Sequence, residues 1–335
     1  NVTGFTANRN KLTKKVLKTI DKYNIIISGE TVIAAVSGGF DSLCMLYVLN
    51  ELKRIRRFSL CVAHLNHSFR SDADEDERFV ADTCKSLGIS FYSKKVNVAE
   101  YAKHNKISFE TAGRELRYDF FDELMRNIEN SVTATAHNAN DNAESFIMHL
   151  LRGSGLGGLT GIQPVRNKII RPLIEQSRQD IENYCVINNL MPKTDFTNFD
   201  DSYTRNDIRH NVMPPLAQRG GIEAIGKAIP LLSADEEFLQ EYTADIFDKY
   251  VNVCDKTAVI DAKSFNRLHK AVKRRLLRKI LEGSEKEISQ IHIDSIISVS
   301  EKNFGGKYAV IPGGAAARLE KGKIIISNEV QNNDK

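Results

Sequence analysis

Short apolar runs alternate with longer helical patterns over the first half of the chain. The apolar runs lie at residues 31–36, 60–65, 89–92 and 131–136. Apolar positions recur at helical spacing over about residues 41–52, 75–87, 108–128 and 140–152. Strands that alternate with helices of this length build a mostly parallel sheet with helices on both faces. The pattern therefore predicts an α/β fold around a mostly parallel sheet that is covered by helices on both faces.

The pattern of predicted helices and strands changes beyond about residue 218. Helical patterns cover residues 231–251 and 264–281, and short strand-like runs lie at residues 308–311 and 323–327. We therefore predict a first domain over residues 1–217 and a smaller α+β domain over residues 218–335.

Composition narrows the class of protein. The 335 residues are 41% hydrophobic and 27% charged, which is typical of a globular chain long enough for two or three compact units. The net charge of +4 permits a nucleic-acid partner without requiring one. No apolar stretch approaches the ~18–20 residues of a membrane span, so we expect a soluble, cytoplasmic protein without a membrane partner. The five cysteines are scattered without a C-x-x-C pair, which disfavours a cysteine-built metal site.

Polar clusters stand at the ends of three predicted strands. SGGFDS follows the first run, HLNHSFR ends the second, and TAHNANDNAES follows the fourth. In parallel sheets of this kind, ligands bind at the carboxyl ends of the strands. We therefore predict that the three clusters converge on one active site in the first domain.

The first cluster has the chemistry of a phosphate-binding loop. Its glycines let consecutive N–H groups point at an anion, and the following helix adds its positive N-terminal dipole. Two serine hydroxyls can donate to phosphate oxygens, and Asp41 can hold a Mg²⁺ ion that bridges phosphates. The lysine of the P-loop pattern is missing, and an ordinary glycine turn is the alternative. We predict that the nucleotide contacts Ser37, Gly38, Gly39, Phe40, Asp41 and Ser42.

The pattern S-G-G-x-D-S after a strand resembles the pyrophosphate loop of the N-type ATP pyrophosphatases, the PP-loop superfamily. Five further segments resemble, in order, the motifs of the tRNA(Ile)-lysidine synthetase family. They are HLNHSFRSDADEDERFV, ETAGRELRYDFF, TAHNANDNAESFIMHLLRGSGLGGLTGI, RPLIEQSRQDI and TDFTNFDDSYTRNDIRHNVMPPL. The resemblance covers about residues 31–216 and implies a parallel, five-stranded, doubly wound sheet of the adenine nucleotide α-hydrolase-like kind.

The resemblance also implies a reaction. In that family ATP adenylates O2 of the wobble cytidine in the CAU anticodon of tRNA(Ile), and pyrophosphate leaves. The ε-amino group of free L-lysine then displaces AMP, which gives lysidine. The expected cofactors are ATP and Mg²⁺, and the expected partners are tRNA(Ile) and L-lysine. The oligomeric state is left open, with a homodimer as one expectation.

Three residues of the third cluster share one face at the start of a helix. His137, Asp141 and Glu144 stand at positions i, i+4 and i+7. Two carboxylates and an imidazole could orient an amine and accept its proton. The resemblance places the acids at the lysine and the histidine beside the nucleotide, whereas a polar first helical turn is the plainer alternative. We predict that all three are catalytic and that the two acids also bind lysine.

This cluster departs from the family pattern. The family usually has T-A-H-H-x-D-D-Q-x-E-T, whereas this chain has Asn138, Asn140, Asn142 and Ser145. A carboxylate of the family is thus an amide at position 140.

Several basic residues complete the predicted site. Arg114 is expected to bind the nucleotide and Arg117 to act in catalysis, because planar guanidinium groups clamp oxyanions. His64 ends the second strand and is expected to face the nucleotide. Arg171, Arg205 and Arg209 lie in later motifs, where phosphate contact and salt bridging compete, and Arg205 is predicted to bind substrate. Lys273 and Arg274 are predicted to contact tRNA phosphates, with a solvated helix face as the alternative.

The segment RGSGLGGLTG, residues 152–161, holds five glycines. We expect it to be mobile and to order over the ATP site or the anticodon loop.

Two other functions remain possible for this sequence: a tRNA 2-thiolation enzyme with the same SGGFDS loop, and a non-catalytic tRNA-binding protein. The thiolation enzymes generally need paired cysteines, which this sequence lacks. A protein that only binds tRNA would not need the acids Asp41, Asp141 and Glu144, which are all present.

Overall fold

The computed structural model describes residues 2–67, 73–192, 204–255, 257–282, 288–301, 308–311 and 316–327. Parts of two motifs, at 68–72 and 193–203, lie outside the described residues. The chain divides into two compact units, Asn1–Pro230 and Leu231–Lys335. The boundary lies inside helix α10 (Gly221–Tyr250), whereas the sequence places it after residue 217.

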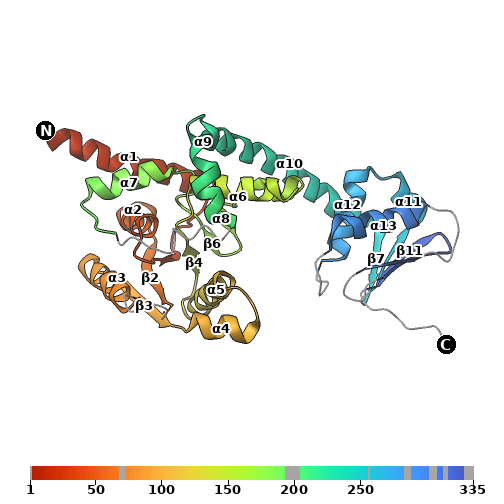
Figure 1. Ribbon diagram of the computed structural model, residues 1–335, viewed down its shortest axis with the longest axis horizontal. Coiled ribbons are helices and arrows are strands. Elements are labelled where there is room, and N and C mark those ends of the chain that lie inside the picture. Colours follow the sequence, from red (N-terminus) through yellow and green to blue (C-terminus); the bar gives the residue numbers. More distant parts are fainter. Residues whose placement is uncertain are drawn as a thin grey trace. The chain divides into compact units, whose positions relative to one another are not determined.

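The first unit is built on a sheet with the strand order β3-β2-β1-β4-β6-β5 (Figure 1). The strands are β1 (Thr31–Ala35), β2 (Ser59–Asn66), β3 (Ser90–Lys95), β4 (Ser131–Ala134), β5 (Val165–Arg166) and β6 (Ile169–Ile170). Five of them are parallel, which confirms the predicted sheet, and β5 is antiparallel to β6. Strands of two residues carry no periodic signal, so β5 and β6 were not predicted.

The register of the sheet brings the first and third polar clusters together. Strand β1 lies between β2 and β4, with Ala35 opposite Ala63 and Ala34 opposite Ala134. All three strands run in the same direction, so the chain leaves each of them at the same edge. The loop after β1 therefore lies beside the loop after β4.

Helices cover both faces of this sheet because side chains alternate along each strand. Val32 and Ala34 of β1 point into a core shared with one set of helices, and Ile33 points into a second core on the other side with Phe120 and Phe121. The first set is α1 (Val2–Lys22), α2 (Phe40–Arg56), α3 (Ala73–Leu87) and α7 (Arg178–Ile187). On the opposite face lies α5 (Phe109–Asn127), packed beside α4 (Val98–Asn105) (Figure 1).

A short helical segment follows α7 and carries two arginines toward the sheet edge. It consists of α8 (Thr204–Asp207), a π-helical turn (Ile208–Val212) and α9 (Met213–Ala217). Ile208 and Met213 pack against Ala143 of α6 (Ala139–Leu151) in a small core that Ile225 and Ile229 complete. Single π-turns are frequent at functional sites.

The glycine-rich segment expected to be mobile is a folded turn. It contains the 3-10 helix Leu156–Thr160, and His149 Nδ1 lies 2.7 Å from the Gly158 carbonyl oxygen. Gly161 has a φ of +64°, and a Cβ there would lie 2.2 Å from Asn142 Oδ1. The glycine at position 161 is thus required for close packing against Asn142 of α6.

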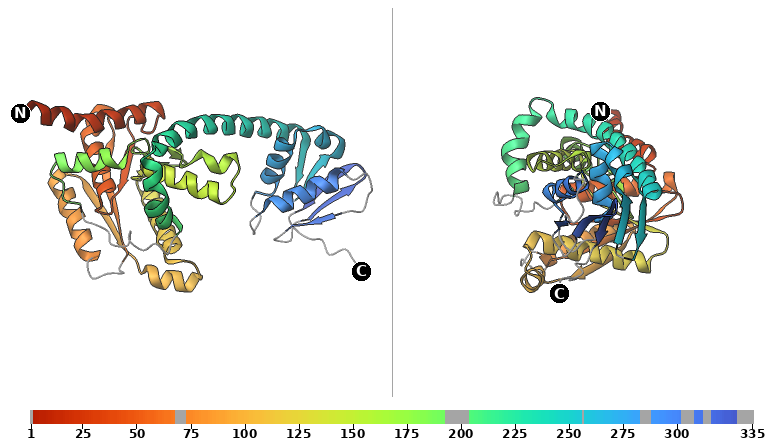
Figure 2. Two further views of the ribbon diagram at one scale, coloured as in Figure 1. Left: turned by 45° about the horizontal axis from the view of Figure 1, so that its top comes forward. Right: turned by 90° about the vertical axis from the view of Figure 1, so that its right-hand side faces the viewer.

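The second unit is an antiparallel sheet with helices packed on one side. Its strands run in the order β7-β8-β11-β10-β9, and Figure 2 shows them in blue beside the helices. The elements are β7 (Val251–Cys254), β8 (Thr257–Asp261), α11 (Ala262–Arg267), α12 (Lys270–Ile280), α13 (Gln290–Glu301), β9 (Tyr308–Val310), β10 (Ala316–Glu320) and β11 (Lys323–Ser327). This confirms a smaller α+β unit.

One helix predicted for this unit is in fact two. The pattern over residues 264–281 is interrupted because His269 caps α12, its Nδ1 accepting the N–H of Ala271 at 3.2 Å. Within the described residues, no helix is long and apolar enough to cross a bilayer.

Each unit has its own core, so we expect separate responses to core mutations. Leu46 is fully buried in the first unit and Leu276 in the second. Leu46→Ala should destabilise the first unit by about 3 kcal/mol through lost burial and a cavity, and Leu276→Ala should act likewise on the second. Urea unfolding followed by hydrogen exchange of the two units measures this. Equal loss of protection in both units for either variant would contradict it.

Candidate active site

The loop between β1 and α2 is shaped around the hydroxyl of Ser42. Ser42 Oγ accepts the N–H groups of Ser37 and Gly38, each at 3.2 Å, and donates to the Gly39 carbonyl at 3.0 Å. Gly38 has a φ of +99°, a conformation that favours glycine. Ser42 was expected to donate to phosphate, but in this structure its hydroxyl holds the loop.

The loop leads into an open helix N-terminus. Gly39 occupies the N-cap of α2, and no described side chain caps the helix there. The first N–H groups of a helix have no partner within it, and together with the helix dipole they favour an anion. The N-terminus of α2 is therefore a suitable place for phosphate oxygens.

Asp41 connects this loop to the third cluster. Its Oδ1 accepts a hydrogen bond from Asn138 Nδ2 at 2.9 Å, and its Oδ2 lies 3.7 Å from Nη2 of Arg178. Burial raises the pKa of Asp41, and the negative charge of Asp141 raises it further. A cation bound beside Asp41 would relieve both effects.

Asn138 is fully buried and has a double role. Its Oδ1 accepts the N–H groups of Asn140 and Asp141, at 2.9 and 3.1 Å, and so caps α6. Asp141 completes a capping box, because its Oδ2 accepts the Asn138 N–H at 3.0 Å. The same amide that starts α6 also holds Asp41.

The other asparagines of this cluster also hold the backbone. Asn140 Oδ1 accepts the N–H of Arg178 at 3.0 Å. Asn142 Oδ1 accepts the N–H of Ile162 at 2.7 Å. The three asparagines that depart from the family pattern thus each form hydrogen bonds that hold the backbone.

Asp141 and Glu144 form an ion-pair cluster with two arginines. Their exposures are only 9% and 3%. Arg209 Nε lies 2.7 Å from Glu144 Oε1, and its Nη2 lies 3.1 Å from Asp141 Oδ1. Arg205 reaches the same two carboxylates at 3.2 Å each. Carboxylates this buried require such partners, because an unpaired buried charge is costly.

The structure brings Asp141 and Glu144 together with Arg205 and Arg209. Arg205 and Arg209 stand four residues apart, so they lie on one face of a helical segment. Both form the salt bridges that the sequence left open beside phosphate contact, and substrate binding by Arg205 stays a prediction.

His137 follows β4 and is held as a neutral imidazole. Its Nδ1 lies 3.0 Å from Thr135 Oγ1. Burial lowers the pKa of His137 to about 4, and nearby arginines contribute to the decrease, while Asp141 opposes it. At neutral pH this side chain therefore offers hydrogen bonds without carrying charge.

His64 supports the backbone ahead of the loop. It is only 4% exposed, and its Nδ1 lies 2.8 Å from the Val36 carbonyl oxygen. Burial lowers the pKa of His64. The expected nucleotide contact is therefore not made through this nitrogen.

Arg114 and Arg117 lie on α5 and are exposed. The Arg114 guanidinium sits 5.0 Å from the centre of the Tyr118 ring. Neither arginine forms an ion pair with a carboxylate among the described residues. Both therefore remain available to an anionic ligand, whereas Arg171 is buried and donates to the Gln163 carbonyl at 2.7 Å.

The predicted basic face of the second unit is largely paired. Lys273 is buried, its side chain 8% exposed, and it contacts Glu301 at 3.3 Å. Arg274 contacts Asp294 at 3.2 Å. Lys273 therefore does not belong to an exposed basic surface, and tRNA contact by Arg274 stays a prediction.

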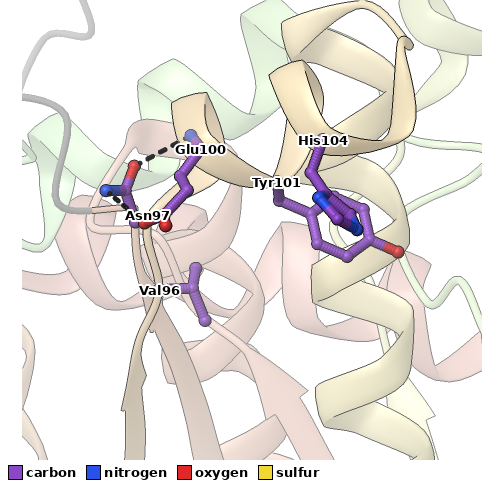
Figure 3. A pocket seen from close by; sticks show the side chains of 5 residues that line it. All are labelled: Val96, Asn97, Glu100, Tyr101 and His104. Carbon is purple, nitrogen blue, oxygen red and sulfur yellow. Dashed lines mark hydrogen bonds between the residues drawn. The ribbon is translucent and has the colours of Figure 1, made fainter.

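A hollow of about 380 Å³ lies on α4, lined by Val96, Asn97, Glu100, Tyr101 and His104 (Figure 3). Asn97 caps α4, its Oδ1 accepting the Glu100 N–H at 3.1 Å and its Nδ2 donating to Glu100 Oε2 at 3.2 Å. Asn97 and Glu100 thus serve the helix cap, and the hollow contains no predicted site residue.

The pKa of His137 predicts an acid-dependent loss of stability. Because its pKa is lowered in the folded state, the unfolded chain binds a proton at higher pH, and the free energy of unfolding falls as pH decreases from about 6.5 to 4. His137→Gln removes this contribution, so the variant should lose less stability than the parent over that range. Urea unfolding at several pH values measures the slopes, with the exposed His104→Gln as control. Identical slopes for parent and His137→Gln would refute the assignment.

Comparison with known proteins agrees with this geometry. The PP-loop domain family matches residues 8–216. The tRNA(Ile)-lysidine synthase of Clostridium acetobutylicum is 38% identical over 319 residues, covering 93% of this chain and 69% of the relative. Its counterpart from Clostridioides difficile is 36% identical, covering 94% of this chain and 70% of the relative.

A solved structure shares the fold. The U34-tRNA thiolase NcsA from Methanococcus maripaludis, with its 4Fe-4S cluster, is 18% identical with a TM-score of 0.55, covering 67% of this chain and 80% of that one. At this identity the likeness concerns the fold alone. The family match and the curated relatives go further: the chain belongs to the PP-loop domain family and, within it, to the tRNA(Ile)-lysidine synthases.

Proposed function

We propose that this chain uses ATP to attach lysine to the wobble cytidine of tRNA(Ile) with a CAU anticodon. The observation that carries the proposal is that one buried amide, Asn138, joins the phosphate-type loop to the acid pair Asp141 and Glu144. An ATP site and an amine site thus share one rim, in a chain that belongs to the lysidine synthases.

In the first step, O2 of the cytidine attacks the α-phosphate of ATP. A new P–O bond forms, the bond to the β-phosphate oxygen breaks, and pyrophosphate leaves. The open N-terminus of α2 and the loop over residues 37–42 would hold the departing group. Arg114 and Arg117 are exposed on α5 and would bind the phosphate of the adenylate.

Asp41 fits a Mg²⁺ ion that takes most of its ligands from phosphates and water. Burial and the negative charge of Asp141 raise the pKa of Asp41, and the nearby arginines offset this only in part. A bound Mg²⁺ ion would neutralise phosphate charge there.

In the second step, the lysine ε-amine attacks C2 of the cytidine. The C–N bond forms, the C–O bond to the adenylate breaks, and AMP leaves with that oxygen. Asp141 and Glu144 would attract the lysine ammonium and accept its protons. Since Arg205 and Arg209 now pair with both acids, lysine must displace part of these contacts.

The remaining parts of the proposal concern tRNA. The domain over residues 218–335 would bind tRNA through basic side chains such as Arg274, which is half-buried and would leave Asp294 to meet a phosphate. A cytoplasmic location and a homodimer belong to the proposal as well.

A thiolation reaction is less well supported. Cys44, Cys61, Cys84 and Cys185 are buried, and Cys254 is exposed in the second unit. Within the part of the chain that the structure describes, no group of three His, Cys, Asp or Glu side chains could hold a metal ion.

The proposal is tested with labelled lysine, ATP, Mg²⁺ and a CAU-anticodon tRNA(Ile) transcript. We expect label in the tRNA and one pyrophosphate released per lysine incorporated. A tRNA(Met) transcript is the matched control and should remain unlabelled. Absence of label at saturating ATP and lysine would reject the function.

Asp41→Ala should slow pyrophosphate release at least about a hundredfold, equivalent to about 2.7 kcal/mol of activation free energy. The reason is that Asp41 is the carboxylate that lies at the phosphate loop. A coupled pyrophosphate assay measures the rate, with circular dichroism to verify folding. An undiminished rate would remove Asp41 from the chemistry.

A further inference from the structure

The phosphate loop lacks a lysine, yet a cation lies beside it on another helix. Arg178 is the first residue of α7, and its Nη2 lies 3.7 Å from Asp41 Oδ2. We propose that Arg178 binds the pyrophosphate end of ATP and supplies the positive charge that the loop lacks. This inference rests on the proposed function and adds a phosphate-binding residue to it.

Arg178 is held loosely enough to change partners. A separation of 3.7 Å is too long for a hydrogen bond, so its guanidinium is attracted to Asp41 without being fixed by it. The Arg178 side chain is 38% exposed and the Asp41 side chain 30% exposed. Both groups can therefore meet a ligand that enters from solvent.

The backbone of Arg178 is fixed, in contrast to its side chain. Its N–H donates to Asn140 Oδ1 at 3.0 Å, and Ser177 caps α7 by accepting the Asp180 N–H. The next turns of α7 are anchored by Ile181 and Tyr184 in the main core of the unit. A fixed backbone therefore carries the guanidinium close to the loop.

Other acids near Arg178 in the sequence already have partners. Glu175 accepts hydrogen bonds from Lys22 at 2.6 Å and Tyr23 at 2.8 Å. Asp180 pairs with Lys15 at 2.7 Å. Among the described residues, Asp41 is the acid with which Arg178 forms an ion pair, so a ligand that engages Asp41 leaves this arginine to the phosphates.

Two further arginines of the described residues are committed to the amine side of the site. Arg205 and Arg209 contact Asp141 and Glu144 at 2.7–3.2 Å. Of the two arginines that lower the pKa of Asp41 against the effect of burial, Arg178 acts more strongly than Arg209. Among the described residues, Arg178 is thus the arginine placed to meet anionic oxygens at the loop.

The test separates the two ends of the nucleotide. Isothermal titration of the full chain with Mg²⁺ present compares inorganic pyrophosphate with AMP. Arg178→Ala should weaken pyrophosphate binding about tenfold or more, equivalent to about 1.4 kcal/mol, because charge-assisted hydrogen bonds are lost. AMP binding should change less than about twofold.

Two further variants control the result. Arg178→Lys keeps the charge but not the fork, so pyrophosphate affinity should fall between parent and alanine variant. Arg54→Ala removes an exposed arginine from the far end of α2 and should bind both ligands like the parent. Thermal unfolding verifies that each variant is folded.

Three results would contradict the inference. Unchanged pyrophosphate affinity in Arg178→Ala overturns it while leaving the proposed function intact, provided that the parent binds ATP. A loss of AMP affinity equal to that of pyrophosphate also overturns it, because the arginine would then act on the fold or on the α-phosphate. A parent chain that binds neither ATP nor pyrophosphate rejects the function and the inference together.

Discussion

The buried side-chain amide of Asn138 holds the two halves of the site together. Its oxygen caps α6 and its nitrogen donates to Asp41. One planar group therefore fixes the start of the helix that carries the acids and the position of the carboxylate in the phosphate loop. An aspartate at this position could cap the helix but could not donate to Asp41 without being protonated. The amide therefore avoids a third buried negative charge beside Asp41 and Asp141.

Charge balance around this amide explains the rest of the arrangement. Three acids, Asp41, Asp141 and Glu144, lie near one another and need cations. Two arginines satisfy the inner pair closely, whereas Arg178 approaches Asp41 only loosely. Under the proposed function, lysine would compete with the arginines for Asp141 and Glu144, and a Mg²⁺ ion would bind beside Asp41.

Long periodic elements were predictable, and irregular ones were not. The patterns over residues 41–52 and 60–65 correspond to α2 and β2, because burial on one face imposes a strict period. The helix expected over residues 264–281 is divided at His269, where a side-chain cap begins a new helix. The glycines of residues 152–161 were read as freedom to move, but close contact with Asn142 requires the glycine at position 161.

The candidate site divides in the same way, into residues that the sequence predicted and partners that only the folded chain brings close. The sequence and its family resemblance were enough to predict the loop over residues 37–42, His137 and the acid pair as site residues, because their chemistry lies within short segments next to strands. The partners of these groups come from distant segments: Arg178 and Arg209 reach them only after the chain has folded. Pairing across more than thirty residues leaves no local periodicity. The burial that makes His137 neutral and Glu144 dependent on arginine is likewise a property of the packed fold alone.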